Sequence, residues 1–184
     1  LGAKTCLFSL MSKDQNSKIL LNILKNNKIT NYSIYSRNIS STIKERIYSN
    51  DYQIARLDRE EKYSGDLSEQ LVNKLIKNLN KFDAVIISDY GKGVINRSIQ
   101  KIIIEAKKKK VIVSIDPYIG SKKFYTGATL ITPNLKEFEI LSDKSVNNKN
   151  FKNISIRFKK ELNLQYLIIT LGREGIVYID QMNK

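Results

Sequence analysis

The chain has 184 residues, of which 41% are hydrophobic, enough to bury one sizeable core, so we expect a single domain. It has no histidine and a single cysteine, Cys6, which excludes Ser-His and Cys-His nucleophilic pairs, histidine-based zinc sites and an internal disulfide. No apolar run is long enough to cross a bilayer and the first residues lack a secretory pattern, so we expect a cytoplasmic protein with no membrane partner.

The net charge is +14, from 32 Lys and Arg against 18 Asp and Glu. Such a charge can serve nucleic-acid binding, but these lysines are spread through the chain beside abundant Asn and Ile. The single run, at residues 107–110, precedes a predicted buried strand, where a solvated helix end explains it. We therefore predict attraction for anionic substrates and no nucleic-acid partner. A basic nucleic-acid-binding module is the rival, and its affinity would fall steeply with salt.

The first third of the chain predicts a strand over residues 4–10, an amphipathic helix over 18–26 and a short strand over 32–36. Two strand-like runs follow, at 42–48 and 52–57, and the Ser-Asn-Asp turn between them predicts a β-hairpin.

The rest of the chain alternates helices with apolar strands. The expected helices are 69–80, 97–107, one opened by Asn134, and 151–161. The expected strands are 84–88, 111–115, 166–170 and 176–180, the last two as a hairpin. Apolar strands between amphipathic helices indicate an α/β fold.

Ligands of open α/β sheets bind beyond the carboxyl ends of the strands, so the turns there are the candidate sites. Asp89 to Gly93 (DYGKG) has two glycines that permit close approach to a ligand, and Lys92 could meet a phosphate. An Asp-capped turn with a solvent lysine is the alternative reading. Asp116, before a proline, is a second candidate, and a plain turn explains it equally well.

The third candidate is the helix start at Asn134. Its spacing to Glu137 fits an N-cap with a reaching acidic partner, which is the structural alternative. The same start offers the N–H groups of Leu135 and Lys136 to a phosphate, while Asn134 and Glu137 can hold magnesium through water.

The fourth candidate is the turn after residues 166–170, where Gly172 and Gly175 would leave room for a nucleotide beside Thr170. A simple hairpin turn explains it as well. The sequence contains neither GxxxxGK[ST] nor GxGxxG, so phosphoryl transfer would need another fold.

Taken in order, these segments resemble the ribokinase-like (PfkB-type) carbohydrate kinases, in the branch that phosphorylates heptose 7-phosphate. The resemblance runs through essentially the whole chain. It is carried by LGA at residues 1–3, STIKERIYSNDYQIARLDREE at 41–61, SDYGKG at 88–93, IDP at 115–117, YTGATLITPNLKEFE at 125–139 and TLGREG at 170–175.

The resemblance implies a three-layer sandwich with a mostly parallel central sheet, and a hairpin at about residues 41–58 that forms a lid and often a dimer contact. It implies transfer of the γ-phosphoryl group of ATP, with Mg²⁺, to the anomeric hydroxyl of heptose 7-phosphate, giving a 1,7-bisphosphate on the route to ADP-heptose for lipopolysaccharide. Asn134, Leu135, Lys136, Glu137, Thr170, Gly172 and Gly175 would line the ATP site, with magnesium at Asn134 and Glu137.

Substrate-binding candidates are Asp89, Lys92 and Asp116, joined by three hairpin cations, Lys44, Arg46 and Arg56, for the substrate's phosphate. A surface salt bridge is the alternative for each hairpin cation.

The catalytic base of this family is the aspartate of a GAGD motif, which does not occur here, and neither does the glycine-rich amino-terminal sugar-binding segment. We expect both to lie beyond the ends, which predicts that residues 1–184 alone are marginally stable and inactive. Met11-Ser12 stands before Asp14, at the place where the family tends to carry a glycine. Another ribokinase-like sugar kinase, or a non-catalytic relative that binds sugar phosphate or nucleotide, remains the alternative.

Overall fold

The computed structural model describes residues 2–63, 65–95, 98–147 and 149–183. Residues 1, 97 and 184, which bound ranges given above, lie outside the described residues. The chain forms two compact units: unit one is Leu1–Leu71 with Lys92–Val94, and unit two is Val72–Gly91 with Ile95–Lys184. No helix in the described ranges has the length and apolar character needed to cross a membrane.

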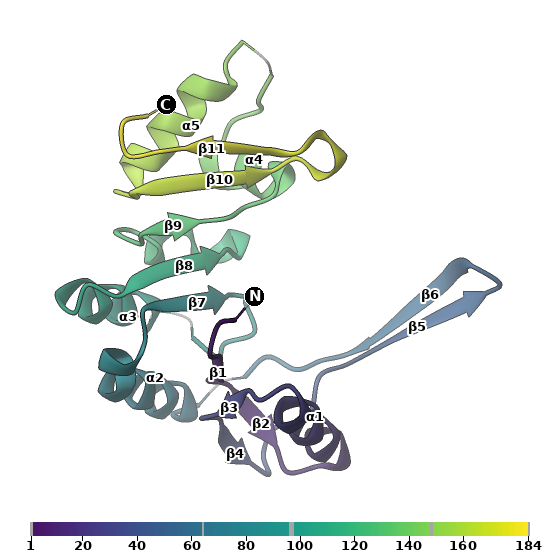
Figure 1. Ribbon diagram of the computed structural model, residues 1–184. Helices are drawn as coiled ribbons and strands as arrows, with labels where there is room; N and C mark the ends of the chain where they lie inside the picture. The colour runs from purple at the N-terminus through teal and green to yellow at the C-terminus, as the bar shows by residue number, and fades with distance from the viewer. Residues whose placement is uncertain (1, 64, 96–97, 148, 184) are drawn as a thin grey trace. The chain divides into compact units, whose positions relative to one another are not determined.

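Unit one begins with two short parallel strand pairs (Figure 1). Strand β1 (Cys6–Leu7) pairs with β3 (Thr30–Asn31), and β2 (Leu10–Ser12) pairs with β4 (Ile34–Ser36). The single strand expected over residues 4–10 is therefore wrong. The backbone changes partner strand within it, so that its bonds run to β3 first and to β4 afterwards.

Helix α1 (Gln15–Asn26) begins three residues earlier than the expected start at residue 18 because Asp14 caps it. The Asp14 carboxylate accepts hydrogen bonds from the Ser17 N–H (2.9 Å) and from the N–H (3.1 Å) and hydroxyl (2.9 Å) of Ser41. The Ser12 hydroxyl above all, then the Ser17 amide and Ser41, hold the pKa of Asp14 well below its ordinary value. One carboxylate thus joins the helix start to the root of the hairpin.

We expect Asp14→Asn to destabilise the fold at neutral pH and to lose that effect in acid. A folded-state pKa below the unfolded value of about 3.9 stabilises the fold above that pH, and the contribution disappears as the pH falls through the folded-state pKa. Urea unfolding of both proteins between pH 7 and pH 2 measures this. Asp51→Asn, in the hairpin turn, is the control. A pH-independent difference would contradict the assignment.

The hairpin expected at 41–58 is confirmed: β5 (Ile43–Ser49) and β6 (Tyr52–Arg59) pair antiparallel, with an irregularity between Ile47 and Tyr48. Lys44 lies opposite Asp58, and Arg46 opposite Arg56. Because side chains alternate along a strand, these four residues share one face of the hairpin. The hairpin leads to α2 (Leu67–Asn78) and the short helix η1 (Leu79–Lys81).

Unit two contains a five-stranded sheet in the order β11-β10-β9-β8-β7 (Figure 1). Its strands are β7 (Ala84–Ser88), β8 (Ile112–Asp116), β9 (Leu130–Ile131), β10 (Tyr166–Thr170) and β11 (Ile176–Ile179). Neighbouring strands are parallel except β10 and β11, which form the expected hairpin. The α/β fold with a mostly parallel sheet is confirmed.

The remaining elements of unit two are α3 (Ser98–Lys108), η2 (Ile119–Phe124), α4 (Leu135–Ser142), α5 (Phe151–Glu161) and η3 (Gly172–Glu174). Side chains at alternate strand positions, such as Val113, Ile115 and Ile169, are buried. Apolar side chains of α3, α4 and α5 are buried too, among them Ile102, Phe138 and Phe158. The other side of the sheet exposes Ile86 (77%) and Ile112 (50%).

Candidate active site

The carboxyl ends of the parallel strands bring four predicted residues to one edge of the unit-two sheet. Ser88 pairs with Asp116, and the Asp89 N–H donates to the Asp116 carbonyl (3.0 Å). Two strands along, Thr170 donates its N–H to the Pro133 carbonyl (3.0 Å) and forms a parallel bridge with Asn134. Asp89, Asp116, Asn134 and Thr170, which are distant in sequence, therefore lie along a single edge, where open α/β sheets bind ligands.

Helix α4 begins at this edge with a complete capping box. The Asn134 side-chain oxygen accepts from the Glu137 N–H (2.9 Å), and the Glu137 carboxylate accepts from the Asn134 N–H (2.8 Å). The structural reading of this motif is confirmed. By helix geometry the N–H groups of Leu135 and Lys136 have no partner within the helix, so the start can still present them to an anion.

Asp116 and Glu137 form the acidic part of the edge. Burial, and secondarily the charge of Glu137, raise the pKa of Asp116 above its ordinary value. A divalent cation between two such carboxylates would relieve their repulsion, and oxygen donors suit Mg²⁺. Since no group of three acidic, His or Cys ligands occurs in the described ranges, water would complete the coordination of Mg²⁺. The donor set fits that ion.

Asp89 is buried, and its carboxylate holds the backbone of its own loop. One carboxylate oxygen accepts from the Gly91 N–H (2.8 Å) and the other from the Tyr125 hydroxyl (2.8 Å). Tyr125 is fully buried and also accepts from the Tyr118 N–H (2.7 Å), and burial is the main cause that raises its pKa. This geometry supports the Asp-capped turn for Asp89, whose substrate role stays a prediction.

Tyr125 is a site residue that the sequence reasoning missed. It stands in a segment that carries the family resemblance, but no local pattern indicates that its hydroxyl reaches a loop 36 positions earlier in the chain. The one available signal is a large aromatic residue that carries a hydroxyl, between Phe124 and Thr126. Such a hydroxyl needs a partner when it is buried.

The turn predicted to border a nucleotide joins β10 to β11. Its backbone is closed by a bond from the Leu171 N–H to the Gly175 carbonyl (2.9 Å). A side-chain carbon added at Gly172 or Gly175 would meet no atom within 4 Å. The hairpin-turn reading is confirmed, and the open space beside Thr170 is compatible with a ligand.

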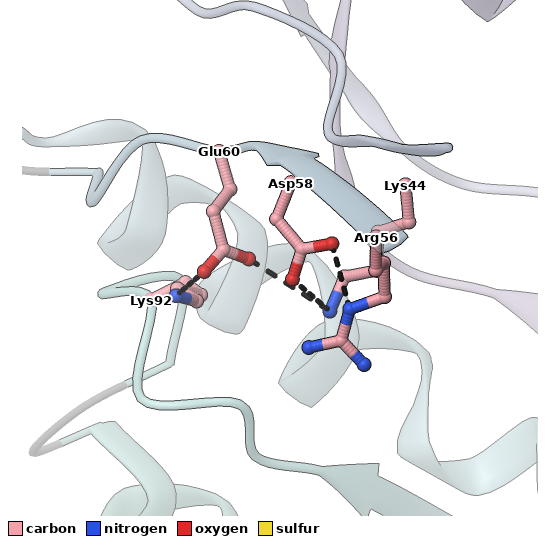
Figure 2. Close-up of polar contacts among 5 residues, drawn as sticks. All are labelled: Lys44, Arg56, Asp58, Glu60 and Lys92. Carbon is pink, nitrogen blue, oxygen red and sulfur yellow. Dashed lines mark hydrogen bonds and ion pairs between the residues drawn. The ribbon is translucent and has the colours of Figure 1, made fainter. Parts of the chain in front are cut away.

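The cations predicted to bind the substrate's phosphate lie in unit one, and three of them are in ion pairs (Figure 2). Lys44 lies 4.0 Å from Asp58 and 3.9 Å from Glu60, the Arg56 Nε lies 2.9 Å from Asp58, and Lys92 pairs with Glu60. The salt-bridge alternative is thus confirmed as a geometry for Lys44 and Arg56, whereas Lys92, for which the alternative was a solvent lysine, is in an ion pair. Arg46 has no carboxylate partner within the described ranges.

This cluster, which we call the hairpin cluster, comprises Lys44, Arg46, Arg56 and Lys92 with Asp58 and Glu60. Its four cations outnumber its two carboxylates, so a charge of about +2 remains for an anion. The Arg56 ion pair uses Nε, and Figure 2 shows the other two guanidinium nitrogens directed away from Asp58. The cluster could therefore accept a phosphate without breaking its existing pairs.

A parallel α/β sheet with a capped helix start and two carboxylates at its carboxyl edge has the layout of an enzyme that handles phosphorylated small molecules. The comparisons with known proteins agree. Residues 1–184 match the pfkB family of carbohydrate kinases. The chain therefore belongs to this family.

Among curated proteins, the chain is similar to bifunctional protein HldE of Campylobacter curvus, with 34% identity over 98% of the chain and 39% of the relative. It is also similar to an uncharacterized sugar kinase of Buchnera aphidicola, with 33% identity over 96% of the chain and 56% of the relative. The chain thus spans only about two fifths to just over half of these relatives.

Among solved structures, the chain resembles a PfkB protein from Polaromonas, with a TM-score of 0.77 at 14% identity over 99% of the chain and 65% of that protein. It also resembles phosphofructokinase-2 from Escherichia coli, with a TM-score of 0.78 at 14% identity over 98% of the chain and 60% of that protein. These likenesses show the ribokinase-like fold.

Proposed function

We propose that the protein carrying this chain is a sugar kinase that transfers the γ-phosphoryl group of ATP to the anomeric hydroxyl of heptose 7-phosphate. The product would be the 1,7-bisphosphate on the route to ADP-heptose and lipopolysaccharide. The main support is the pfkB family match over the whole chain, together with relatives named HldE. We place the reaction in the cytoplasm, with neither a nucleic acid nor a membrane as partner.

For ATP we propose the α4 start and the turn after β10. The N–H groups of Leu135 and Lys136 would face phosphate oxygens, and Gly172 and Gly175 would leave space for the nucleotide beside Thr170. Mg²⁺, held through water by Asn134 and Glu137 and balanced by Asp116, would neutralise phosphate charge. Phosphoryl transfer depends mainly on positioning and charge neutralisation, which these groups supply.

For the substrate's phosphate we propose the hairpin cluster. A phosphate group carries about −1.5 to −2 charges at pH 7, which matches the excess of about two positive charges in the cluster. An unphosphorylated sugar would leave that excess unbalanced. The same charge count predicts selection of sugar phosphates over free sugars.

Arg46→Gln is expected to raise KM for the sugar phosphate by about 10- to 100-fold while KM for ATP stays within about two-fold, because one charge-assisted hydrogen bond contributes about 1.5–3 kcal/mol. Steady-state kinetics with each substrate varied separately measures both constants. Arg59→Gln is the matched control, since Arg59 pairs with Glu45 (3.7 Å) on the other face of the hairpin. An equal change in KM for the sugar phosphate in both variants would show that Arg46 does not bind the phosphate.

A coupled assay of ADP release from the full-length gene product tests the function. Turnover that requires both Mg²⁺ and heptose 7-phosphate is the expected result. Turnover of a different sugar would instead identify the protein as another ribokinase-like sugar kinase. Binding of ATP without turnover of any sugar would instead identify a non-catalytic relative.

We also propose a homodimer formed through the hairpin. Five large hydrophobic side chains there are exposed: Ile47, Tyr48, Tyr52, Ile54 and Leu57. Exposed apolar residues grouped on a protruding strand pair are typical of association surfaces. Light scattering after size exclusion should give a dimer, and Ile54→Lys with Leu57→Lys should give a monomer. A monomeric parent protein would overturn this proposal.

A further inference from the structure

A cavity of about 400 Å³ opens at the amino ends of β8, β9 and β10 in unit two. Its wall includes Ile112 at the start of β8, Thr129 just before β9 and Gln165 just before β10. This is the sheet edge opposite Asp116, the last residue of β8, and Asn134, which follows β9. Its volume lies within the range of roughly 300–1,000 Å³ usual for small-molecule sites.

The four lysines at 107–110 form two pairs with different surroundings. Lys108 pairs with Glu105 (2.6 Å), and Lys109 donates to the Ile76 carbonyl (3.4 Å). Lys107 and Lys110 line the cavity instead, and neither has an ion-pair partner in the described ranges. No described lining residue is acidic, so no carboxylate of the wall offsets these two positive charges.

The other polar groups of the wall add hydrogen-bond donors. The Thr129 hydroxyl accepts from the Val113 N–H (3.1 Å) and keeps its own hydrogen for donation. The Gln165 side-chain oxygen accepts from Gln181 (3.3 Å), which leaves the Gln165 amide nitrogen as a donor. The Asn163 amide and the apolar side chains of Ile103 and Leu164 complete the wall. The cavity is therefore cationic, rich in donors and partly apolar.

Two helices, α3 and α5, end beside this cavity, and free carbonyl groups at helix ends would repel an anion. Here the chain satisfies such carbonyls itself. The Val111 N–H donates to the Ala106 carbonyl (2.9 Å), and the Leu164 N–H donates to the Lys159 carbonyl (3.0 Å). Both bonds close the helix ends, so the lysine charges are less offset than at an open terminus.

We propose that this amino-edge cavity binds a small phosphorylated metabolite, with Lys107 and Lys110 on the phosphate and the apolar wall against the carbon skeleton. An ammonium group meets a phosphate as a compact charge, and Thr129, Asn163 and Gln165 supply the neutral donors. This site is separate from the proposed ATP edge and does not depend on the proposed kinase function.

Ribose 5-phosphate is the probe, titrated into the ¹⁵N-labelled full-length gene product, with ribose as the matched ligand. We expect ribose 5-phosphate, and not ribose, to shift the amide resonances of Gly127, Thr129 and Asn163. Replacement of Lys107 and Lys110 by Gln should weaken this binding at least ten-fold, whereas Lys108→Gln and arginine at both positions should preserve it.

Three results would overturn the proposal. One is the absence of shifts at these amides at millimolar ribose 5-phosphate. The second is binding of ribose 5-phosphate by the Lys107 and Lys110 glutamine variant that is as tight as binding by the parent protein. That result would show that the two lysines do not contact the phosphate. The third is salt-sensitive binding of an RNA oligonucleotide through the same lysines without metabolite binding, which would assign them to nucleic acid.

Discussion

Replacing Tyr125 with alanine is expected to lower the free energy of unfolding by about 3–5 kcal/mol, the range for removing a large aromatic side chain from a core. Tyr125 is fully buried, and its hydroxyl joins Asp89 to the Tyr118 backbone. The substitution therefore leaves a cavity and also removes one of the two hydrogen-bond partners of the buried Asp89 carboxylate. Chemical denaturation of the parent and variant proteins measures the difference.

Tyr125→Phe separates the two causes. It keeps the ring and removes only the hydroxyl, so it should cost about 1–3 kcal/mol, the penalty for leaving a buried polar group without a partner. Tyr90→Ala is the control, because Tyr90 in the same loop is 69% exposed and should change stability by less than about 0.5 kcal/mol. A phenylalanine variant as stable as the parent would show that the hydroxyl contacts contribute nothing.

Gly93→Ala is the second substitution with a large expected effect, about 2–5 kcal/mol, from left-handed backbone strain and overpacking together. Gly93 has a φ of +87°, and an added side-chain carbon would collide with the Tyr63 carbonyl oxygen. The neighbouring Lys92 carbonyl accepts from the Tyr63 N–H (2.7 Å), so this backbone cannot move apart without losing that bond.

Gly172→Ala provides the control for Gly93→Ala, since Gly172 also has positive φ (+61°) but open space around it. It should cost only the backbone strain, about 1–2 kcal/mol. If both alanine variants lost the same free energy of unfolding, the close approach to Tyr63 would not add to the cost of Gly93→Ala. Displacement of Lys92 should further weaken phosphate binding in the Gly93 variant alone.

Much of the fold could be predicted from local patterns. Four strands of unit two are apolar runs bounded by turns, and the hairpin is marked by a polar turn between two β-rich runs, so these elements appear within two residues of their expected bounds. The short strand β9 was not predicted. The first strand was predicted wrongly because an apolar run does not reveal that its backbone bonds pass from one neighbour to another at Phe8 and Ser9. The early start of α1 depends on Asp14, whose capping role needed the structure.

The candidate site, like the fold, has local features that the sequence predicts and long-range contacts that it does not. The capping box of Asn134 and Glu137 is local and could be predicted from its spacing, whereas the bridge from Asn134 to Thr170 depends on the strand order. The Arg56–Asp58 ion pair is local, because the two residues lie two positions apart on one face of β6, but the ion pairs of Lys44 and Lys92 depend on cross-strand register and on contact with a distant loop. No sequence spacing specifies such contacts, which is why a free cation and a paired one could not be told apart.

The most direct test of the account is phosphoryl transfer by the full-length gene product, with ATP, Mg²⁺ and heptose 7-phosphate, followed by ³¹P NMR. The expected result is ADP together with a new resonance from the anomeric phosphate, both dependent on Mg²⁺. The product should be lost when Glu137 and Asp116 are replaced together by alanine. Intact ATP after incubation with heptose 7-phosphate and a panel of other sugar phosphates would contradict the account.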